Sequence, residues 1–478
     1  MTLKRSDIAL IAGTSTLALV VLVVWVITVP AREIKVRLAE EEPAAEKTTA
    51  EPEESPTGQL VKGAGEPAGM PGRWTQFRGG DRSNVVHEAP NLARSWPEGG
   101  LSVVWDREVG AGHAGAAVLD GKVYLADYDL DNHRDVVRCL SLADGEAIWS
   151  RSYRSKVKRI HGSSRTVPAV TEDYVVAIGP KADVYCLDSQ TGEQIWRMDL
   201  VEEFGTEVPP WYAGQCPLIE GDRVILAPGG EPMMMAVELA SGNILWETPN
   251  PGDWGMTHSS ITPMDYGDGR QYIYCTTQGV VGVSASDGAL LWTEPRWKIA
   301  LATVPSPLVV DESRVFLSGG YDSGAMMLRL SGEGADIKTE IEFKLGPEVF
   351  GAEQQTPILY EGHIYGIIPS GELACLNLEG ERLWTSGKTT RFELGPLLIA
   401  DGLILALHGQ EGVLHMVKAV AESYQPLEKL PVIEGHDIWG PMAMVGDLLL
   451  LRDVDTLKCL RLPIEQQAAV RWTTEKSR

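Results

Sequence analysis

Tryptophan recurs at a nearly constant interval through the middle of this chain, and this recurrence limits the folds that the chain can adopt. The successive intervals are 44, 47, 50 and 46 residues in the series Trp105, Trp149, Trp196, Trp246 and Trp292. Trp384 follows 92 residues later, with Phe343 near the missing step. A period of 40–50 residues is typical of propellers and solenoids. Most members end one phrase: Asp144-Gly-Glu-Ala-Ile-Trp149, Thr191-Gly-Glu-Gln-Ile-Trp196, Ser241-Gly-Asn-Ile-Leu-Trp246, Asp287-Gly-Ala-Leu-Leu-Trp292 and Glu379-Gly-Glu-Arg-Leu-Trp384.

The content of one repeat, residues 166–198, favours a propeller. Four short runs of β-branched and aromatic residues are separated by Gly, Pro, Asp and Ser: 167–170, 174–178, 184–187 and the run that carries Trp196. Such runs predict β-strands joined by tight turns, and nothing between them has the length or the 3.6-residue period of a helix. Four antiparallel strands in about 45 residues match one propeller blade.

Counting the innermost strands predicts an all-β, eight-bladed propeller. These strands begin near Ala116, Thr166, Cys216, Ile261, Pro305, Thr356, Gly395 and Pro441. The last repeat, 441–462, has only three clear strands, whereas the segment 101–109 resembles an outer strand with no blade before it. We expect segment 101–109 to complete blade eight and close the ring, because closure leaves no open sheet edge. Residues 468–472 are the alternative source of this strand.

The first 73 residues differ in composition from the repeats. Residues 8–29 contain no charged side chain and are long enough to cross a bilayer, although a cleaved signal peptide is the alternative. The following residues are rich in Glu, Pro, Ala, Gly and Thr and cannot bury a core. We expect a short cytoplasmic tail (1–7), a transmembrane anchor (8–29), an acidic Pro/Glu-rich disordered linker (30–73) and the propeller (74–478). The chain is then a single-pass membrane protein with its propeller in the periplasm or at the cell exterior.

Charge and cysteine usage narrow the classes of ligand. The formal net charge is −24, which argues against nucleic acid and against anionic lipid surfaces as partners. Four of the six cysteines occupy one phase, the third strand of a blade: Cys139, Cys186, Cys375 and Cys459. No Cys-x-x-Cys motif is present, so we expect buried free thiols rather than disulfides or a metal site.

The repeat phrase resembles the docking motif of quinoprotein-type (PQQ-like) β-propellers. The segment Trp74-Thr-Gln-Phe-Arg-Gly-Gly-Asp81 is similar to the opening of membrane-anchored, BamB-like PQQ-repeat proteins of planctomycete-type bacteria. The resemblance covers residues 74 to about 462 and implies the fold rather than one activity. Family members that are PQQ-dependent dehydrogenases have a vicinal Cys-Cys pair, a stacking Trp and a Glu/Asn/Asp set for Ca²⁺. This sequence has no Cys-Cys pair, so PQQ is not expected as a cofactor.

The loops that lead into the innermost strands vary much more than the strands. Loops on a rigid scaffold are where functional sites concentrate, so the variation predicts a polar ligand site around the central channel. The first loop contains His113. The candidate ligand-binding residues in the other loops are His161, Arg165, Trp211, Tyr212, Gln215, Trp254, His258, Glu353, Gln354, Gln355, His436, Asp437 and Trp439.

Each of these residues also has a purely structural interpretation. Trp254 and Trp439 could fill the channel, and the histidines could satisfy loop backbone groups. If a reaction occurs, His161, His258 and His436 are the groups in these loops whose unperturbed pKa lies near neutrality. Asp437 or Glu353 could orient one of them, and Arg165 could hold an anion.

The remaining motifs are weak. Asp127, Asp129 and Asp131 resemble the start of a calcium loop, but the sixth position is Asn132 and the twelfth is Arg138, where such loops need Gly and Glu. The sequence therefore predicts a membrane-anchored, extracytoplasmic propeller that acts as a binding or scaffold module for a protein or glycan ligand. The alternative is a PQQ-dependent or histidine-based oxidoreductase that acts in the central channel.

Overall fold

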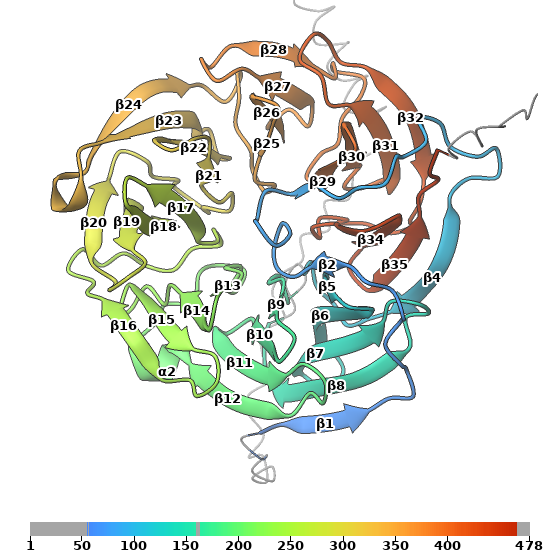
Figure 1. The fold of residues 1–478 in the computed structure, drawn as a ribbon, viewed down its shortest axis with the longest axis horizontal. Helices are drawn as coiled ribbons and strands as arrows, with labels where there is room; N and C mark the ends of the chain where they lie inside the picture. The colour runs from blue at the N-terminus through green and yellow to red at the C-terminus, as the bar shows by residue number, and fades with distance from the viewer. Residues whose placement is uncertain (1–54, 56, 159–162, 466–478) are drawn as a thin grey trace, which may run out of the picture. The chain divides into compact units, whose positions relative to one another are not determined.

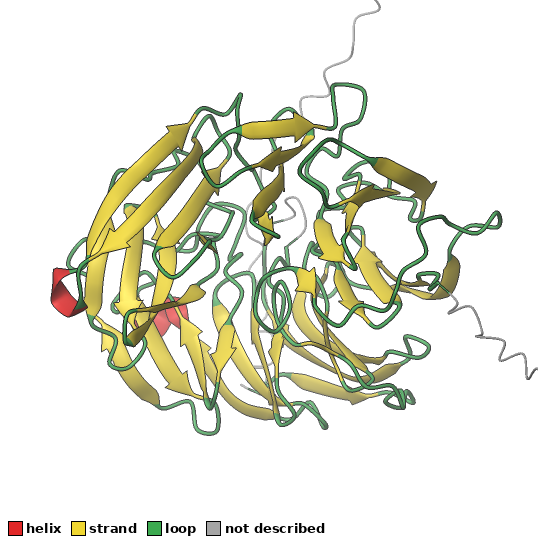
Figure 2. Ribbon diagram, turned by 45° about the horizontal axis from the view of Figure 1, so that its top comes forward, coloured by secondary structure: helices red, strands yellow, loops and turns green. Residues whose placement is uncertain are grey.

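The computed structural model describes residues 55, 57–158 and 163–465, which form eight sheets arranged as blades around a central axis (Figure 1). Strands make up nearly all of the regular structure (Figure 2). Two short helices interrupt them, α2 (Leu200–Phe204) and the 3₁₀ helix η1 (Gly334–Asp336). The innermost strands begin within three residues of the predicted positions, so the prediction of an eight-bladed all-β propeller is confirmed.

The first four blades each contain four consecutive strands. Blade one holds β5 (Ala117–Leu119), β6 (Lys122–Asp129), β7 (Arg134–Ser141) and β8 (Ala147–Arg154). Blade two holds β9 (Ala169–Val170), β10 (Tyr174–Ile178), β11 (Asp183–Asp188) and β12 (Gln194–Asp199). Blade three holds β13 (Leu218–Glu220), β14 (Arg223–Leu226), β15 (Met234–Glu238) and β16 (Ile244–Thr248). Blade four holds β17 (Thr262–Tyr266), β18 (Gly269–Thr276), β19 (Gly279–Ser284) and β20 (Leu290–Glu294).

Blades five to seven repeat this order, and blade eight combines the two ends of the repeat region. Blade five holds β21 (Leu308–Val309), β22 (Arg314–Gly319), β23 (Gly324–Ser331) and β24 (Lys338–Leu345). Blade six holds β25 (Ile358–Tyr360), β26 (His363–Ile367), β27 (Leu373–Leu376) and β28 (Arg382–Thr385). Blade seven holds β29 (Leu397–Ala400), β30 (Leu403–Leu407), β31 (Val413–Lys418) and β32 (Pro426–Pro431). Blade eight holds β33 (Ala443–Val445), β34 (Leu448–Arg452), β35 (Thr456–Arg461) and β4 (Ser102–Glu108).

The pairing of β4 with β35 closes the ring. Trp105 lies opposite Cys459 in this pair, in the same register that other blades use within a single repeat. The prediction that segment 101–109 completes blade eight is therefore confirmed. The alternative segment, 468–472, lies outside the described residues.

The tryptophan of each repeat phrase needs a small residue opposite it on the third strand. The pairs are Trp149 with Cys139, Trp196 with Cys186, Trp246 with Ala236, Trp292 with Gly282, Trp384 with Cys375 and Trp105 with Cys459. A Cβ atom at Gly282 would lie 2.1 Å from the indole nitrogen of Trp292. This packing explains why four cysteines share one phase, since cysteine is small and apolar. All six cysteines are buried and none is bonded to another.

The same tryptophans dock one blade onto the next. The indole of Trp149 packs on Gly192, the glycine of the next repeat phrase, where a Cβ atom would lie 2.6 Å from the ring. Gly192 also has a φ of 70°, a conformation that disfavours residues with a Cβ atom. The Trp149 indole nitrogen then donates a hydrogen bond to the Ser189 carbonyl (3.2 Å). The glycine and the tryptophan of the phrase are therefore the two halves of the contact between blades.

The linker prediction is wrong for residues 57–73, which are ordered. Strand β1 (Gln59–Lys62) pairs antiparallel with β8 and extends the outer edge of blade one, and Leu60 packs against its core. Composition predicted disorder because this segment has few apolar residues. An open strand edge, however, supplies backbone hydrogen bonds to almost any extended segment. Residues 1–54, which include the expected tail, anchor and most of the linker, lie outside the described part of the chain. No helix among the described residues is long and apolar enough to span a membrane.

Residues 73–86 cross the central axis, and we call this segment the N-terminal strap (Figure 1). It begins with β2 (Arg73–Trp74), which pairs with the innermost strand of blade one. It ends with β3 (Val85–Val86), which pairs in parallel with the innermost strand of blade seven. Between these strands, main-chain and side-chain hydrogen bonds join the strap to blades two, three and six. One segment thus holds the inner edges of five blades.

Two buried arginines anchor the strap. Arg78 donates to the carbonyls of Thr356 (2.7 Å) and Pro357 (2.9 Å) in blade six, and to those of Arg82 and Ser83 within the strap. Arg82 donates to the Pro217 carbonyl (3.2 Å) at the start of blade three. Burial, together with the charge of Arg82, lowers the pKa of Arg78 to about 9, so the guanidinium is still charged at neutral pH. The resemblance motif around Trp74–Asp81 is therefore a structural element.

Candidate functional site

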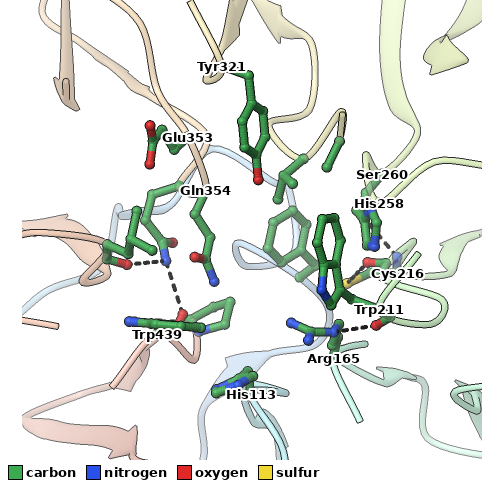
Figure 3. A pocket seen from close by; sticks show the side chains of 17 residues that line it. His113, Arg165, Trp211, Cys216, His258, Ser260, Tyr321, Glu353, Gln354 and Trp439 are labelled. Atoms are coloured by element: carbon green, nitrogen blue, oxygen red, sulfur yellow. Dashed lines mark hydrogen bonds between the residues drawn. The ribbon is translucent and has the colours of Figure 1, made fainter. Parts of the chain in front are cut away.

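A cavity of about 300 Å³ lies on the axis of the ring, among the loops that lead into the innermost strands (Figure 3). Phe77 of the strap lines this cavity and also lines a separate cavity of about 160 Å³ beside Arg78 and Arg82. The ring of Phe77 therefore stands between the two spaces and forms the floor of the axial cavity.

Aromatic side chains form two walls of the cavity. On one wall Trp439 stacks on His113, with ring centroids 4.9 Å apart and an angle of 29° between the planes. The Trp439 indole nitrogen is buried and has no hydrogen-bond partner within the described part of the chain. On the other wall Trp211 lies 6.4 Å from the ring of His258. Figure 3 shows that the two indoles lie on opposite sides of the space between them.

Polar groups from several blades converge between these walls. Arg165 donates from Nε to the Trp211 carbonyl (2.7 Å), which fixes the guanidinium at the wall. Gln355 donates from Nε2 to the carbonyls of Trp439 (3.0 Å) and Leu394 (3.3 Å). Glu353 lies at the opposite side from Arg165 (Figure 3), and its pKa is raised by burial and by the nearby charge of Asp322. The cavity therefore has a positive and a negative end.

His258 is neutral near pH 7. Burial and, to a smaller extent, the charge of Arg165 lower its pKa to about 4, while hydrogen bonds with the backbone of Pro210 and Tyr212 act in the opposite direction. A neutral imidazole can donate one hydrogen bond and accept another. At neutral pH this histidine is therefore a recognition or positioning group rather than a source of positive charge.

The lowered pKa of His258 predicts an acid-dependent loss of stability. The unfolded chain binds a proton at His258 below its ordinary pKa of 6.5, whereas the folded protein binds one only near pH 4. The stabilising contribution is complete above pH 6.5 and is lost as the pH falls towards 4. We expect the wild type to lose about 3 kcal/mol more than His258→Gln between pH 7 and pH 4. Urea unfolding at pH 7, 5.5 and 4 measures this difference, and parallel curves would contradict it.

The structure brings together seven of the predicted ligand-binding residues. The residues that line the axial cavity are Arg165, Trp211, His258, Glu353, Gln354, Gln355 and Trp439. They come from the second, third, fourth, sixth and eighth loops counted along the chain, so only ring closure makes them neighbours. His161 lies outside the described residues.

Five other predicted residues do not line the cavity. The Gln215 amide donates to the Ala227 carbonyl and accepts from the Ala227 amide in blade three, and it also donates to the Tyr274 hydroxyl in blade four. The Tyr212 hydroxyl bonds the main chain of Lys158. Trp254 packs against the core between blades three and four. His436 and Asp437 pair with each other at 3.2 Å on the exposed surface. For these residues the structural interpretation accounts for the contacts that the side chains make.

The weak calcium candidate is also accounted for by local contacts. Asp127 is buried and pairs with Arg138, while it accepts a hydrogen bond from the Gly110 amide. Asp129 accepts from the main chain of Asp131 and Asn132 and so shapes the turn between β6 and β7. Within the described ranges no group of three His, Cys, Asp or Glu side chains is arranged to hold a metal ion.

Sequence reasoning missed several cavity residues. Tyr321 lies in the hairpin between β22 and β23, and its hydroxyl points into the space (Figure 3). In a propeller blade, the hairpin between the second and third strands lies on the same face as the loop into the first strand. Sequence reasoning considered only the loops into the first strands, so it left out the hairpins that make up the other half of this face. Phe77 was missed because nothing in the sequence shows that the strap crosses the axis, and Cys216 because the sequence places it at the start of an innermost strand rather than in a loop.

Comparison with known proteins agrees with this architecture. A family model described as outer membrane protein assembly factor BamB matches residues 133–386, which is 254 of the 478 residues. The chain belongs to this family. The match runs from β7 to the end of blade six, so it includes the loops that carry Arg165, Trp211, His258 and Glu353.

Individual BamB proteins are distant relatives. The chain is 24% identical over 290 residues to the outer membrane protein assembly factor BamB of Yersinia pestis, covering 56% of this chain and 68% of the relative. It is 23% identical over 283 residues to that of Moranella endobia (strain PCIT), with the same coverage of 56% and 68%.

Solved structures share the fold. The crystal structure of BamB from Moraxella catarrhalis aligns with a TM-score of 0.52 at 14% identity, over 76% of this chain and 100% of that one. A europium-containing methanol dehydrogenase aligns with a TM-score of 0.59 at 14% identity, over 81% and 91%. Because the same fold serves an assembly factor and a dehydrogenase, the fold does not decide the function.

Proposed function

We propose that this chain is an extracytoplasmic binding module, held at a membrane by its N-terminal segment, that engages a protein partner through the loop face of the propeller. The observation that carries the proposal is the axial cavity of about 300 Å³ with its aromatic walls. Aromatic walls with a few convergent polar groups are typical of ligand sites. A space of this size accepts one side chain or one sugar ring of a larger ligand. The partner therefore inserts a single group while the rest of it lies on the surrounding loops.

The family supports a protein as the ligand, since its relatives are named as assembly factors. A glycan is the second candidate, and the two indoles with Gln354 and Gln355 support it because aromatic faces and amides suit sugar rings. Both candidates use the same cavity. The two candidates differ in the part of the ligand that lies on the loops around the cavity, which is polypeptide in one case and further sugar rings in the other.

The cavity does not fit the cofactor that the dehydrogenase relatives suggest. A calcium-bound quinone needs several oxygen ligands on the metal, but Glu353 is the only carboxylate among the described residues that line the cavity. Cys216 lines it as a single cysteine without an adjacent one. We therefore derive no redox step for this chain.

Removal of the aromatic walls is expected to weaken ligand binding strongly. Full-length protein is screened by thermal shift against short peptides, monosaccharides and PQQ with Ca²⁺. A ligand that stabilises the wild type should lose at least about 2 kcal/mol of binding free energy in Trp211→Ser/Trp439→Ser, because buried aromatic anchors dominate such sites. Ile195→Ser, an exposed residue on blade two, serves as the control. Ligands that stabilise the double variant equally, or no stabilisation by any of them, would argue against the proposal.

A further inference from the structure

A larger groove of about 870 Å³ opens beside the axial cavity and shares His258 and Ala302 with it. Five connections line the groove: those from β12 to β13, β14 to β15, β16 to β17, β18 to β19 and β20 to β21. The groove therefore spans the loop face of blades three and four. A ligand that enters the cavity has this groove as a neighbouring surface.

The groove is acidic. Glu203, Glu207, Glu231 and Asp253 line it, and among the residues that the structure describes no Lys or Arg does. All four side chains are exposed, and within the described part of the chain none of the four has a salt-bridge partner. One carboxylate oxygen of Glu203 already accepts a hydrogen bond from the Asp199 amide (2.8 Å) at the start of α2. Carboxylates gathered on one surface without partners raise the local concentration of cationic ligands.

The groove also offers apolar contact. Leu301 lines it with 52% of its surface exposed, and Pro209 and Pro210 lie on the opposite connection. Gly229 and Gly230 are tightly placed, since a Cβ atom on either would lie 2.1 Å from a main-chain atom of a neighbouring loop. Glycines at these positions let the connection between β14 and β15 pack closely against the neighbouring loops that form the groove.

We propose that this groove binds an extended segment of a partner protein in which Lys or Arg residues alternate with apolar ones. The inference rests on the proposed function and names the chemistry of the partner. The basic side chains pair with Glu207, Glu231 and Asp253, and the apolar side chains pack on Leu301 and the two prolines. Acidic glycans, nucleic acids and anionic membranes are repelled by the same surface.

The test uses full-length protein and a fluorescein-labelled peptide of alternating Lys and Leu, with Glu-Leu and Lys-Ser peptides for comparison. Anisotropy titrations should show binding of the Lys-Leu peptide that weakens with added salt, while each comparison peptide binds at least about tenfold more weakly. Glu207→Gln/Glu231→Gln/Asp253→Asn should weaken binding by at least about tenfold. Glu312→Gln/Glu340→Gln/Glu379→Gln removes the same charge from exposed sites on blades five and six and should change binding by less than about twofold.

Equal weakening by the two triple variants would overturn the inference, because it would show a response to net charge alone. Binding lost in Trp211→Ser but retained in the groove variant would place the peptide in the axial cavity, so the groove assignment would fail and the proposed function would stand. Equal binding of the Glu-Leu peptide would also overturn it. If sedimentation shows a dimer that the groove variant dissociates, the occupant is a second copy of this chain and the partner assignment is wrong.

Discussion

Replacement of Arg78 by methionine is expected to lower the free energy of unfolding by about 4 kcal/mol, the largest effect of any single strap substitution. The guanidinium donates to four main-chain carbonyls, two of them in blade six. Hydrogen bonds from a charged donor stabilise by about 1.5–3 kcal/mol each. Burial of the guanidinium, which lowers its pKa, has a cost that offsets part of their sum. Urea unfolding followed by tryptophan fluorescence measures the change.

Arg73→Met is the matched control within the same strap. Arg73 pairs with Glu172 on the surface, where both side chains are more than half exposed, and such pairs contribute about 0–1 kcal/mol. Arg78→Lys should fall between the two, because an ammonium keeps the charge but cannot reproduce the planar fork of donors. If Arg78→Met unfolds at the same urea concentration as Arg73→Met, the strap does not hold the inner strands together.

Gly192→Ala is expected to lower the free energy of unfolding by about 3 kcal/mol, the second large effect. The residue has a φ of 70°, which costs a residue with a Cβ atom about 1–2 kcal/mol. The added methyl group would also lie 2.6 Å from the Trp149 indole, and forcing an extra methyl into a packed contact costs about 1–3 kcal/mol. Chemical denaturation of the purified variant gives the total.

Gly221→Ala separates these two contributions. Gly221 has a similar φ of 64° in the turn between β13 and β14, but no atom lies within 4 Å of the position of its Cβ. Only the backbone cost applies there, so we expect a loss of about 1 kcal/mol. The difference between the two variants measures the contact between blades. Equal losses would mean that the Trp149 indole moves aside at no cost in stability. Gly192 would then be needed only for its backbone conformation in the turn.

The binding predictions and the stability predictions test different parts of the molecule. Arg78 and Gly192 hold the strap and the blades in place, whereas Trp211 and Trp439 act at the cavity and Glu207 at the groove. A variant of the second kind that keeps wild-type stability but loses a ligand therefore reports on function.

The sequence by itself determined the repeat, the number of blades and the closing strand. These features depend on local rules: alternating apolar runs, turn residues, and a glycine and a tryptophan that must recur wherever blades meet. The position of Cys139 opposite Trp149 follows from the same repeat. About half of the predicted ligand-binding residues also line the cavity. They lie in the loops that vary most between repeats, and these loops take no part in the contacts between blades.

Only the tertiary structure decided which loop residues face the axis and what closes the cavity. Gln215 and Trp211 are four residues apart in one loop, yet Gln215 bonds the main chain of blade three and Trp211 lines the cavity. The direction of each side chain depends on loop backbone conformation, which has no periodic signal. The strap could not be foreseen either, because its contacts join residues up to 313 positions apart. Buried guanidiniums that bond carbonyls of distant blades leave no pattern in the sequence, since any main chain can accept those bonds.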